Sequence, residues 1–156
     1  MAQAKGRNFR GILLSPSGKV LLMKMAEPRT GHQFWICPGG TAEDGESGEE
    51  CLRRELLEET GYAGGEIGPV LWEREYSYTC EDERVHQDEQ YFLVRTQEFE
   101  ATMAGNPEAL EITAFQGFRW WDVEEICLSE EEFGPALLGS LGPWVLVGRS
   151  PGERTP

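Results

Sequence analysis

The order of apolar and polar residues along the chain predicts a series of short strands and one strong helix. Apolar segments at 7–14 and 19–25 flank a Ser-Pro-Ser-Gly sequence at 15–18, which is typical of a turn, so they are expected to form a β-hairpin. A shorter apolar run at 34–37 ends at a Pro-Gly-Gly sequence at 38–40, which interrupts a regular strand. The first forty residues are therefore expected to contribute three strands.

Residues 47–60 carry the clearest helix signals in the sequence. Ser47 followed by Glu50 matches a capping box, in which the two side chains satisfy backbone N–H groups at the start of a helix. Gly61 stands where helices commonly end in a left-handed residue. One well-delimited helix is expected over this segment.

The second half of the chain predicts more strands than helices. Segments 70–79 and 90–97 have the composition of strands, with 80–88 as a polar loop between them. A further strand is expected at 115–121, followed by a helical turn at 123–126.

The C-terminal part adds one more predicted helix and a tail. Ser129 with Glu132 is a second capping-box match and predicts a helix that continues to Leu141. No linker divides the chain, so residues 1–149 are expected to form one domain and 150–156 a flexible tail. The mixture of hairpins and longer connections predicts a mixed α+β or α/β sandwich.

Acidic residues dominate the charge: 28 Asp and Glu against 14 Lys and Arg give a net charge of −14. A surface of this sign repels nucleic acid polymers and anionic membranes, so neither is expected as a partner. The excess is uneven, with a net −6 over residues 40–62 and −5 over 73–89. Small anionic ligands are still compatible with it, because a bound divalent cation inverts the charge of a local site.

Cysteine spacing and hydropathy exclude several other classes. The four cysteines, Cys37, Cys51, Cys80 and Cys127, contain no CxxC pair, which argues against a zinc site or a disulfide framework. No apolar run has the length of a signal-peptide core or a membrane span. A reduced, cytoplasmic compartment is therefore expected.

Three carboxylates share one face of the predicted helix. Glu55, Glu58 and Glu59 are spaced i, i+3 and i+4, so they fall within an arc of about 100°. Unpaired carboxylates at this spacing repel one another, and the last turn of a helix disfavours anions. A hard divalent cation removes the repulsion, and Mg²⁺ suits a few carboxylates together with phosphate oxygens. The three glutamates are therefore candidate metal ligands.

The residues around these carboxylates form a longer pattern. In order, its specified positions are Gly40, Glu46, Arg54, Glu55, Leu56, Glu58, Glu59 and Gly61. This string resembles the Nudix box, which reads Gly, five residues, Glu, seven residues, Arg-Glu-aliphatic, one residue, Glu-Glu, one residue, Gly and an aliphatic residue. The last position is the one departure, because Tyr62 replaces the aliphatic residue. The FWICPGG entry and the later RWWDVEEI segment extend the resemblance more loosely.

The resemblance implies a fold and a reaction. The fold is a Nudix-type α/β/α sandwich in which a mixed sheet lies between helices. The reaction is hydrolysis of a phosphoanhydride bond in a nucleoside diphosphate derivative or nucleoside polyphosphate, with metal-activated water as the nucleophile.

The resemblance also assigns roles to residues of the box. Glu55, Glu58 and Glu59 are expected to bind Mg²⁺, with Mn²⁺ as the alternative metal, and the backbone carbonyl of Gly40 to complete the coordination. Arg54 is expected to orient a helix carboxylate instead of contacting the substrate.

The general base is left open between two residues. Glu58 is the candidate inside the box, and Glu111 is the candidate in a later loop, where a solvated acid is an equally good interpretation. Glu89 is a further candidate metal ligand, and Glu46 is expected to brace the loop before the helix.

Aromatic and basic residues outside the box are candidates for substrate binding. Trp72 and Tyr78 offer rings on which a nucleobase stacks, and Arg10 offers a charge to substrate phosphates. The competing interpretation is that strand aromatics pack in the core and that Arg10 is a flanking-strand charge.

Two other functions are compatible with the same scaffold. A non-catalytic module that senses a nucleotide or metabolite is the main alternative, and the intact set of glutamates argues against it. Isoprenoid isomerisation requires a catalytic cysteine, and Cys37 has no evident partner in the sequence. The expected partner is a small-molecule nucleotide, and the oligomeric state is open, with a homodimer among the options.

Overall fold

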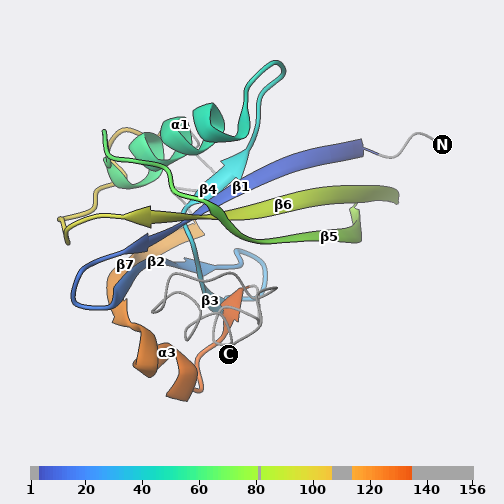
Figure 1. Ribbon diagram of the computed structural model, residues 1–156. Coiled ribbons are helices and arrows are strands. Elements are labelled where there is room, and N and C mark those ends of the chain that lie inside the picture. Colours follow the sequence, from blue (N-terminus) through green and yellow to red (C-terminus); the bar gives the residue numbers. More distant parts are fainter. Residues whose placement is uncertain (1–3, 81, 107–113, 135–156) are drawn as a thin grey trace, which may run out of the picture.

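The computed structural model describes residues 4–80, 82–106 and 114–134, in which a mixed sheet is flanked by two helices (Figure 1). The elements in chain order are β1 (Ala4–Leu14), β2 (Lys19–Ala26), β3 (Gln33–Ile36), β4 (Gly39–Thr41), α1 (Gly48–Thr60), β5 (Val70–Cys80), β6 (Glu83–Arg95), β7 (Phe115–Asp122), α3 (Val123–Leu128) and β8 (Phe133–Gly134).

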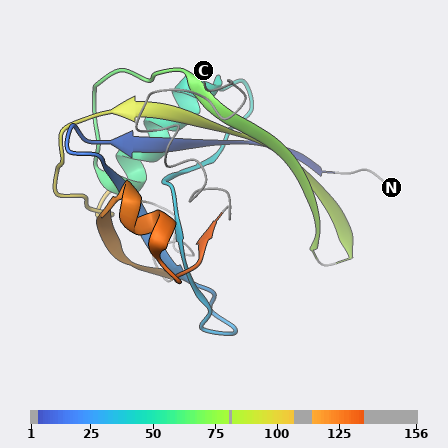
Figure 2. The same cartoon turned by 60° about the horizontal axis from the view of Figure 1, so that its bottom comes forward.

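Strand β1 organises the sheet because both of its edges are paired. It runs parallel to β6 from Ala4, opposite Val85, to Leu14, opposite Arg95. Its other edge pairs antiparallel with β4, where Phe9 lies opposite Gly40. The order along the sheet is β5-β6-β1-β2-β3-β8, with β4 attached to β1 and β7 to β2. The far end of the β5–β6 ribbon extends beyond the rest of the sheet beside the start of β1 (Figure 2).

The turn predicted at 15–18 is confirmed, but the expected hairpin is short. The Gly18 N–H donates to the Ser15 carbonyl at 3.0 Å. Strands β1 and β2 then pair only at Leu14 and Val20 within the described residues. They diverge because β4 and β6 occupy the edges of β1, whereas β2 pairs with β3 and β7.

Two hydrophobic clusters cover opposite faces of the sheet. On one face, α1 packs its buried side chains against β1, β2 and β6; this cluster contains Phe9, Leu13, Leu21, Cys51, Leu52, Leu56 and Val94. On the other face, α3 and β8 complete a cluster that includes Ile12, Leu14, Val20, Leu22, Trp35, Trp121, Val123, Ile126 and Phe133. Neighbouring residues of β1 alternate between these clusters, as a strand buried on both faces requires. The predicted mixed α/β sandwich is confirmed.

Helix α1 has the ends that the sequence predicts. The Ser47 side chain accepts from the Glu50 N–H, the Glu50 side chain accepts from the Ser47 N–H, and Gly61 adopts a left-handed φ of 79°. The backbone polar groups at both ends of the helix are thus hydrogen-bonded locally. Which side of the helix faces the sheet is set by the packing of Leu52 and Leu56.

The predicted polar loop at 80–88 is wrong. Apart from residue 81, which lies outside the described part of the chain, this segment belongs to the β5–β6 ribbon, with β6 starting at Glu83. Polarity suggested a loop, but backbone pairing with β5 and β1 holds the segment extended although many of its side chains are polar.

The helix predicted to start at Ser129 is also wrong over its described part. Ser129 instead ends α3, which begins with a capping box of Asp122 and Glu125. Phe133 pairs with Trp35 of β3 and is buried against Trp121, so tertiary packing overrides the local capping signal. The continuation to Leu141 and the tail at 150–156 lie outside the described residues.

The other predicted strands, at 34–37, 70–79, 90–97 and 115–121, are confirmed as β3, β5, β6 and β7, and the helical turn at 123–126 as α3. None of the helices in the described ranges is long and apolar enough to cross a membrane.

Gly39 and Gly45 provide a paired test of backbone constraint. Gly39 has a φ of +149°, and a Cβ there would lie 2.1 Å from the Phe9 carbonyl oxygen, whereas Gly45, at φ +80°, has open space. We expect Gly39→Ala to lower the free energy of unfolding by more than about 2 kcal/mol and Gly45→Ala by about 1 kcal/mol. Urea unfolding measures both, and equal losses would contradict the close approach of Gly39 to β1.

Candidate active site

The glycine strap, which consists of Pro38, Gly39 and Gly40, meets the carboxylates of α1. The Gly39 N–H donates to Glu59 Oε2 at 3.0 Å. A Cβ on Gly40 would lie 2.6 Å from the Glu55 carboxyl carbon, so the carboxylate occupies the space that any side chain at this position would fill. Glu55 and Glu59 are only 8% and 3% exposed. The structure thus brings the predicted ligands Gly40, Glu55 and Glu59 together.

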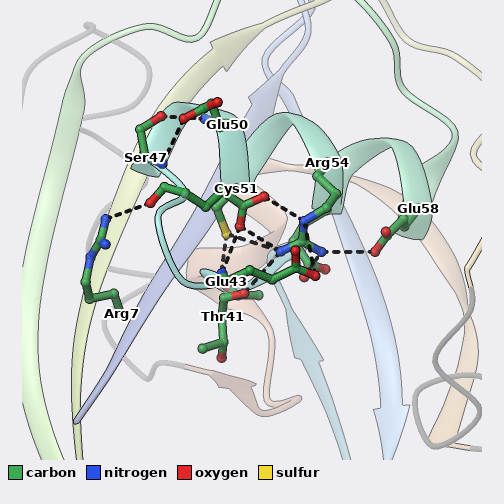
Figure 3. A network of polar contacts seen from close by, with 11 residues as sticks. Arg7, Thr41, Glu43, Ser47, Glu50, Cys51, Arg54 and Glu58 are labelled. Carbon is green, nitrogen blue, oxygen red and sulfur yellow. Dashed lines mark hydrogen bonds and ion pairs between the residues drawn. The ribbon is translucent and has the colours of Figure 1, made fainter.

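Arg54 links the loop before α1 to two carboxylates of the helix. Its guanidinium binds Glu46 through two hydrogen bonds, of 2.8 and 2.9 Å. Its Nη1 donates to Glu55 at 3.0 Å and to Glu58 at 3.3 Å. In Figure 3 the Arg54 guanidinium lies amid these contacts, with Glu58 on one side and Thr41 on the other. Arg54 therefore orients carboxylates in this structure, as its place in the box suggests.

This network shifts the ionisation of its members. The hydrogen bonds from Arg54 lower the pKa of Glu46 to about 2, and the same contacts raise the pKa of Arg54. Burial, together with the nearby charges of Glu46 and Glu55, raises the pKa of Cys51 to about 12. The Cys51 thiol therefore stays protonated and donates to the Gly40 carbonyl at 3.6 Å.

The donor set fits a hard divalent cation. Arg54 supplies one positive charge to Glu46, Glu55 and Glu58 together, so these carboxylates exceed the charge that it can neutralise. Oxygen ligands with surplus negative charge are the ligands that Mg²⁺ and Mn²⁺ prefer. The Glu55 carboxylate lies against Gly40, so a predicted side-chain ligand and the residue of the predicted backbone ligand are neighbours, which supports the same interpretation.

Arg10, predicted to meet substrate phosphates, is directed at the protein itself. Its Nη1 donates to the Cys37 carbonyl at 3.0 Å and to the Gly39 carbonyl at 3.5 Å. Its Nε contacts Glu89 at 3.5 Å. Burial acts to lower the pKa of Arg10, but the surrounding anionic and polarisable groups, led by Glu59, outweigh it and raise that pKa.

Other predicted site residues are placed only in part. Trp72 is half-buried, and its ring lies 5.6 Å from that of Tyr91, so it packs against the core as the competing interpretation proposed. Tyr78 belongs to β5, but its side chain lies outside the described part of the structure. Glu111 also lies outside the described residues.

An open cavity of about 700 Å³ lies beside the N-terminal end of α1. It is lined from β1, α1 and the β5–β6 ribbon, and none of the three box glutamates faces it. Near it, ligand atoms of Glu75, His86 and Asp88 lie within 4.8 Å of one another. This group shares no residue with the box, and the exposed Glu75 and intermediate His86 and Asp88 contrast with the buried Glu55 and Glu59.

Sequence reasoning singled out Glu89 as a candidate metal ligand but missed the polar cluster that it forms with Arg74 and Tyr91. Glu89 is 3% exposed and accepts from Arg74 Nε at 2.8 Å and from the Tyr91 hydroxyl at 2.9 Å. Register was the missing information: Arg74 lies opposite Glu89 only because β5 and β6 pair through the segment that was expected to be a loop.

Comparison with known proteins agrees with the fold and the box. The family model of the NUDIX domain matches residues 4–141. The chain therefore belongs to the Nudix hydrolase family.

Individual relatives match either over a short segment or at low sequence identity. A protein of Bacillus subtilis (strain 168) named for 8-oxo-dGTP diphosphatase activity is 47% identical over 51 residues, which are 33% of this chain. The match spans about a third of the length of that relative, 32%. The solution structure of the E. coli ORF135 protein has a TM-score of 0.66 at 19% identity and covers 97% of this chain and 96% of its own. The Shewanella oneidensis NrtR NUDIX domain complexed with ADP ribose has a TM-score of 0.64 at 18% identity, with coverages of 94% and 90%.

The Glu46–Arg54 pair gives a pH-dependent prediction. Because the folded pKa of Glu46 is about 2, below its ordinary value of 4.5, its ionised form stabilises the fold above the ordinary value, and this contribution is lost as the pH falls toward 2. We expect Glu46→Gln to lower the free energy of unfolding by about 1.5–3 kcal/mol near neutral pH. Chemical unfolding across the acidic range should show the difference from wild type shrinking below about pH 4.5.

Glu43→Gln is the matched control. The Glu43 side chain is 72% exposed and lies 4.0 Å from Arg54. The control should change the free energy of unfolding by less than about 0.5 kcal/mol. A loss as large as that of Glu46→Gln would show that the bidentate pair is not the stabilising contact.

Proposed function

We propose that the protein is a divalent-metal-dependent pyrophosphohydrolase that cleaves a phosphoanhydride bond of a nucleotide derivative. The observation that carries this proposal is the convergence of two buried carboxylates, Glu55 and Glu59, on the glycine strap. Buried carboxylates are costly to maintain without cations, and the family relationship gives this arrangement a chemical purpose.

Glu55, Glu58, Glu59 and the Gly40 carbonyl are the proposed ligands. When bound, Mg²⁺ or Mn²⁺ polarises phosphate oxygens and lowers the pKa of a water molecule. Arg54 holds Glu55 and Glu58 in place through its Nη1 group. Glu46, bound to the other edge of the same guanidinium, keeps that group fixed.

Glu58 is the proposed general base inside the box. Its side chain is 23% exposed, more than that of Glu55, and it contacts Arg54 at the longer distance of 3.3 Å. It is thus the box carboxylate with the most access to an attacking water, whose proton it would accept. Glu111 is retained as the alternative base.

The proposed substrate is a nucleoside polyphosphate or a nucleoside diphosphate linked to another group. The short similarity to the protein named for 8-oxo-dGTP diphosphatase activity supports testing an oxidised purine triphosphate. The structural likeness to a domain complexed with ADP ribose supports testing a diphosphate conjugate. Tyr78 is the proposed base-stacking residue, whereas Trp72 is set aside because its ring packs against Tyr91 and the core.

Cys37 does not support isomerase chemistry. It is fully buried, and burial raises the pKa of its thiol to about 12. A thiol in this environment is neither exposed nor readily ionised, as a reactive cysteine would be.

A substrate panel with Mg²⁺ or Mn²⁺ tests the proposal. We expect wild-type protein to release nucleoside monophosphate from at least one nucleotide, and chelation of the metal to abolish turnover. Glu58→Gln should reduce kcat about 10²- to 10⁴-fold, because the proton acceptor is lost. Product analysis by chromatography measures both effects.

Glu49→Gln on the same helix is the matched control. Its side chain is 58% exposed and pairs with Arg53 at 3.8 Å, so the substitution changes the charge of α1 without touching the proposed ligands. Its kcat should equal that of wild type. If the protein binds a nucleotide of the panel but forms product from none of them, the result would favour the sensing module instead.

Glu111→Gln separates the two candidate bases. If Glu58 is the base, this variant should lose only a few fold in kcat, since a solvated loop acid contributes little to the chemical step. The pH dependence of kcat for both variants provides the measurement. A loss at Glu111 that exceeds the loss at Glu58 would reassign the base.

A further inference from the structure

Glu89 is a buried carboxylate outside the box that gathers three donors. It is 3% exposed and accepts from Arg74 Nε at 2.8 Å, from the Tyr91 hydroxyl at 2.9 Å and from Arg10 Nε at 3.5 Å. A carboxylate engaged by two guanidinium groups and a hydroxyl is poorly suited to bind a cation directly. Its burial therefore calls for a different role.

Arg10 connects Glu89 to the glycine strap. The Nη1 group of Arg10 donates to the Cys37 carbonyl at 3.0 Å and to the Gly39 carbonyl at 3.5 Å. The N–H of the same Gly39 residue donates to Glu59 at 3.0 Å. Gly39 is therefore held at its N–H by a proposed metal ligand and at its carbonyl by the Glu89–Arg10 pair.

The charges around Arg10 give Glu89 a second effect. Glu59 and Glu89 both stabilise the cation of Arg10, whose side chain is 19% exposed. Glu89 contacts the guanidinium directly at 3.5 Å, so Glu89 supplies the adjacent counter-charge that partly desolvated Arg10 requires.

We infer that Glu89 and Arg10 are positioning residues of the metal centre: Glu89 fixes and neutralises Arg10, and Arg10 holds the Gly39–Gly40 peptide so that the Gly40 carbonyl and Glu59 present oxygen to the cation. The inference rests on the proposed metal site. It adds Arg10 of β1 and Glu89 of β6, which lie outside the box. Neither residue is proposed to contact the metal or the substrate directly.

Direct titration of the metal-free full chain with Mn²⁺ tests this inference, with free Mn²⁺ followed by electron paramagnetic resonance. We expect Glu89→Gln and Arg10→Lys each to weaken Mn²⁺ binding about 10- to 100-fold, the range for residues that orient metal ligands. Lysine keeps the charge of Arg10 but lacks the fork that reaches the strap and Glu89 together. At saturating Mn²⁺, the KM for nucleotide should be that of wild type.

Glu73→Gln is the matched control, because it removes one negative charge from the adjacent strand at an exposed position. It should bind Mn²⁺ with wild-type affinity. Thermal unfolding of each metal-free variant separates lost binding from lost fold, and if Glu89→Gln does not unfold cooperatively, Arg10→Lys decides the test.

The outcomes distinguish this inference from the proposed function. Wild-type Mn²⁺ affinity in a folded Glu89→Gln or Arg10→Lys variant overturns the positioning role. Loss of binding in Glu89→Gln with wild-type affinity in Arg10→Lys would instead make Glu89 a ligand and overturn it equally. If Glu59→Gln binds Mn²⁺ as wild type does, the proposed metal site itself is wrong.

Discussion

The hydrogen bond from the Gly39 N–H to Glu59 is the contact on which the arrangement of the site depends. It joins a strap attached to β1 with the last turn of α1, 20 positions further along the chain. The strap cannot move toward β1, because Gly39 already lies against the Phe9 carbonyl. The helix cannot turn, because Leu52 and Leu56 are buried on its inner face. The positions of Glu55, Glu58 and Glu59 thus follow from how α1 packs on the sheet.

The distribution of charge follows from the same constraint. A net charge of −14 suggests that the chain repels polyphosphates. At the site, however, two arginines each donate hydrogen bonds to several acceptors. Arg54 contacts Glu46, Glu55 and Glu58, and Arg10 contacts Glu89 and the carbonyls of Cys37 and Gly39. This sharing leaves negative charge unbalanced around the strap, which suits a cation. Glu89 also shows that the acidic segment 73–89 includes a buried structural carboxylate.

What the sequence could predict was local. The two ends of α1 and the grouping of its glutamates depend on spacings of three to five residues, so Ser47, Glu50 and Gly61 were sufficient to place them. The start of β6 and the end of α3 depend on distant partners: Arg74 pairs with Glu89 across a ribbon, and Phe133 with Trp35 across nearly a hundred residues. Polarity and a capping-box match at Ser129 were outweighed by these pairings, which no local pattern encodes.

Arg10 illustrates how burial changes the meaning of a charged residue. In the sequence alone, an arginine on a strand near a candidate phosphate site suggests substrate binding. In the structure, however, the residues of β1 alternate between two buried clusters. Arg10 has the same parity as Ile12, so it enters the protein on the side away from α1 and must find partners there. Those partners are the carbonyls of Cys37 and Gly39 and the carboxylate of Glu89. Gly39 therefore links β6 to α1, because Glu59 accepts from its N–H and Arg10, which contacts Glu89, donates to its carbonyl.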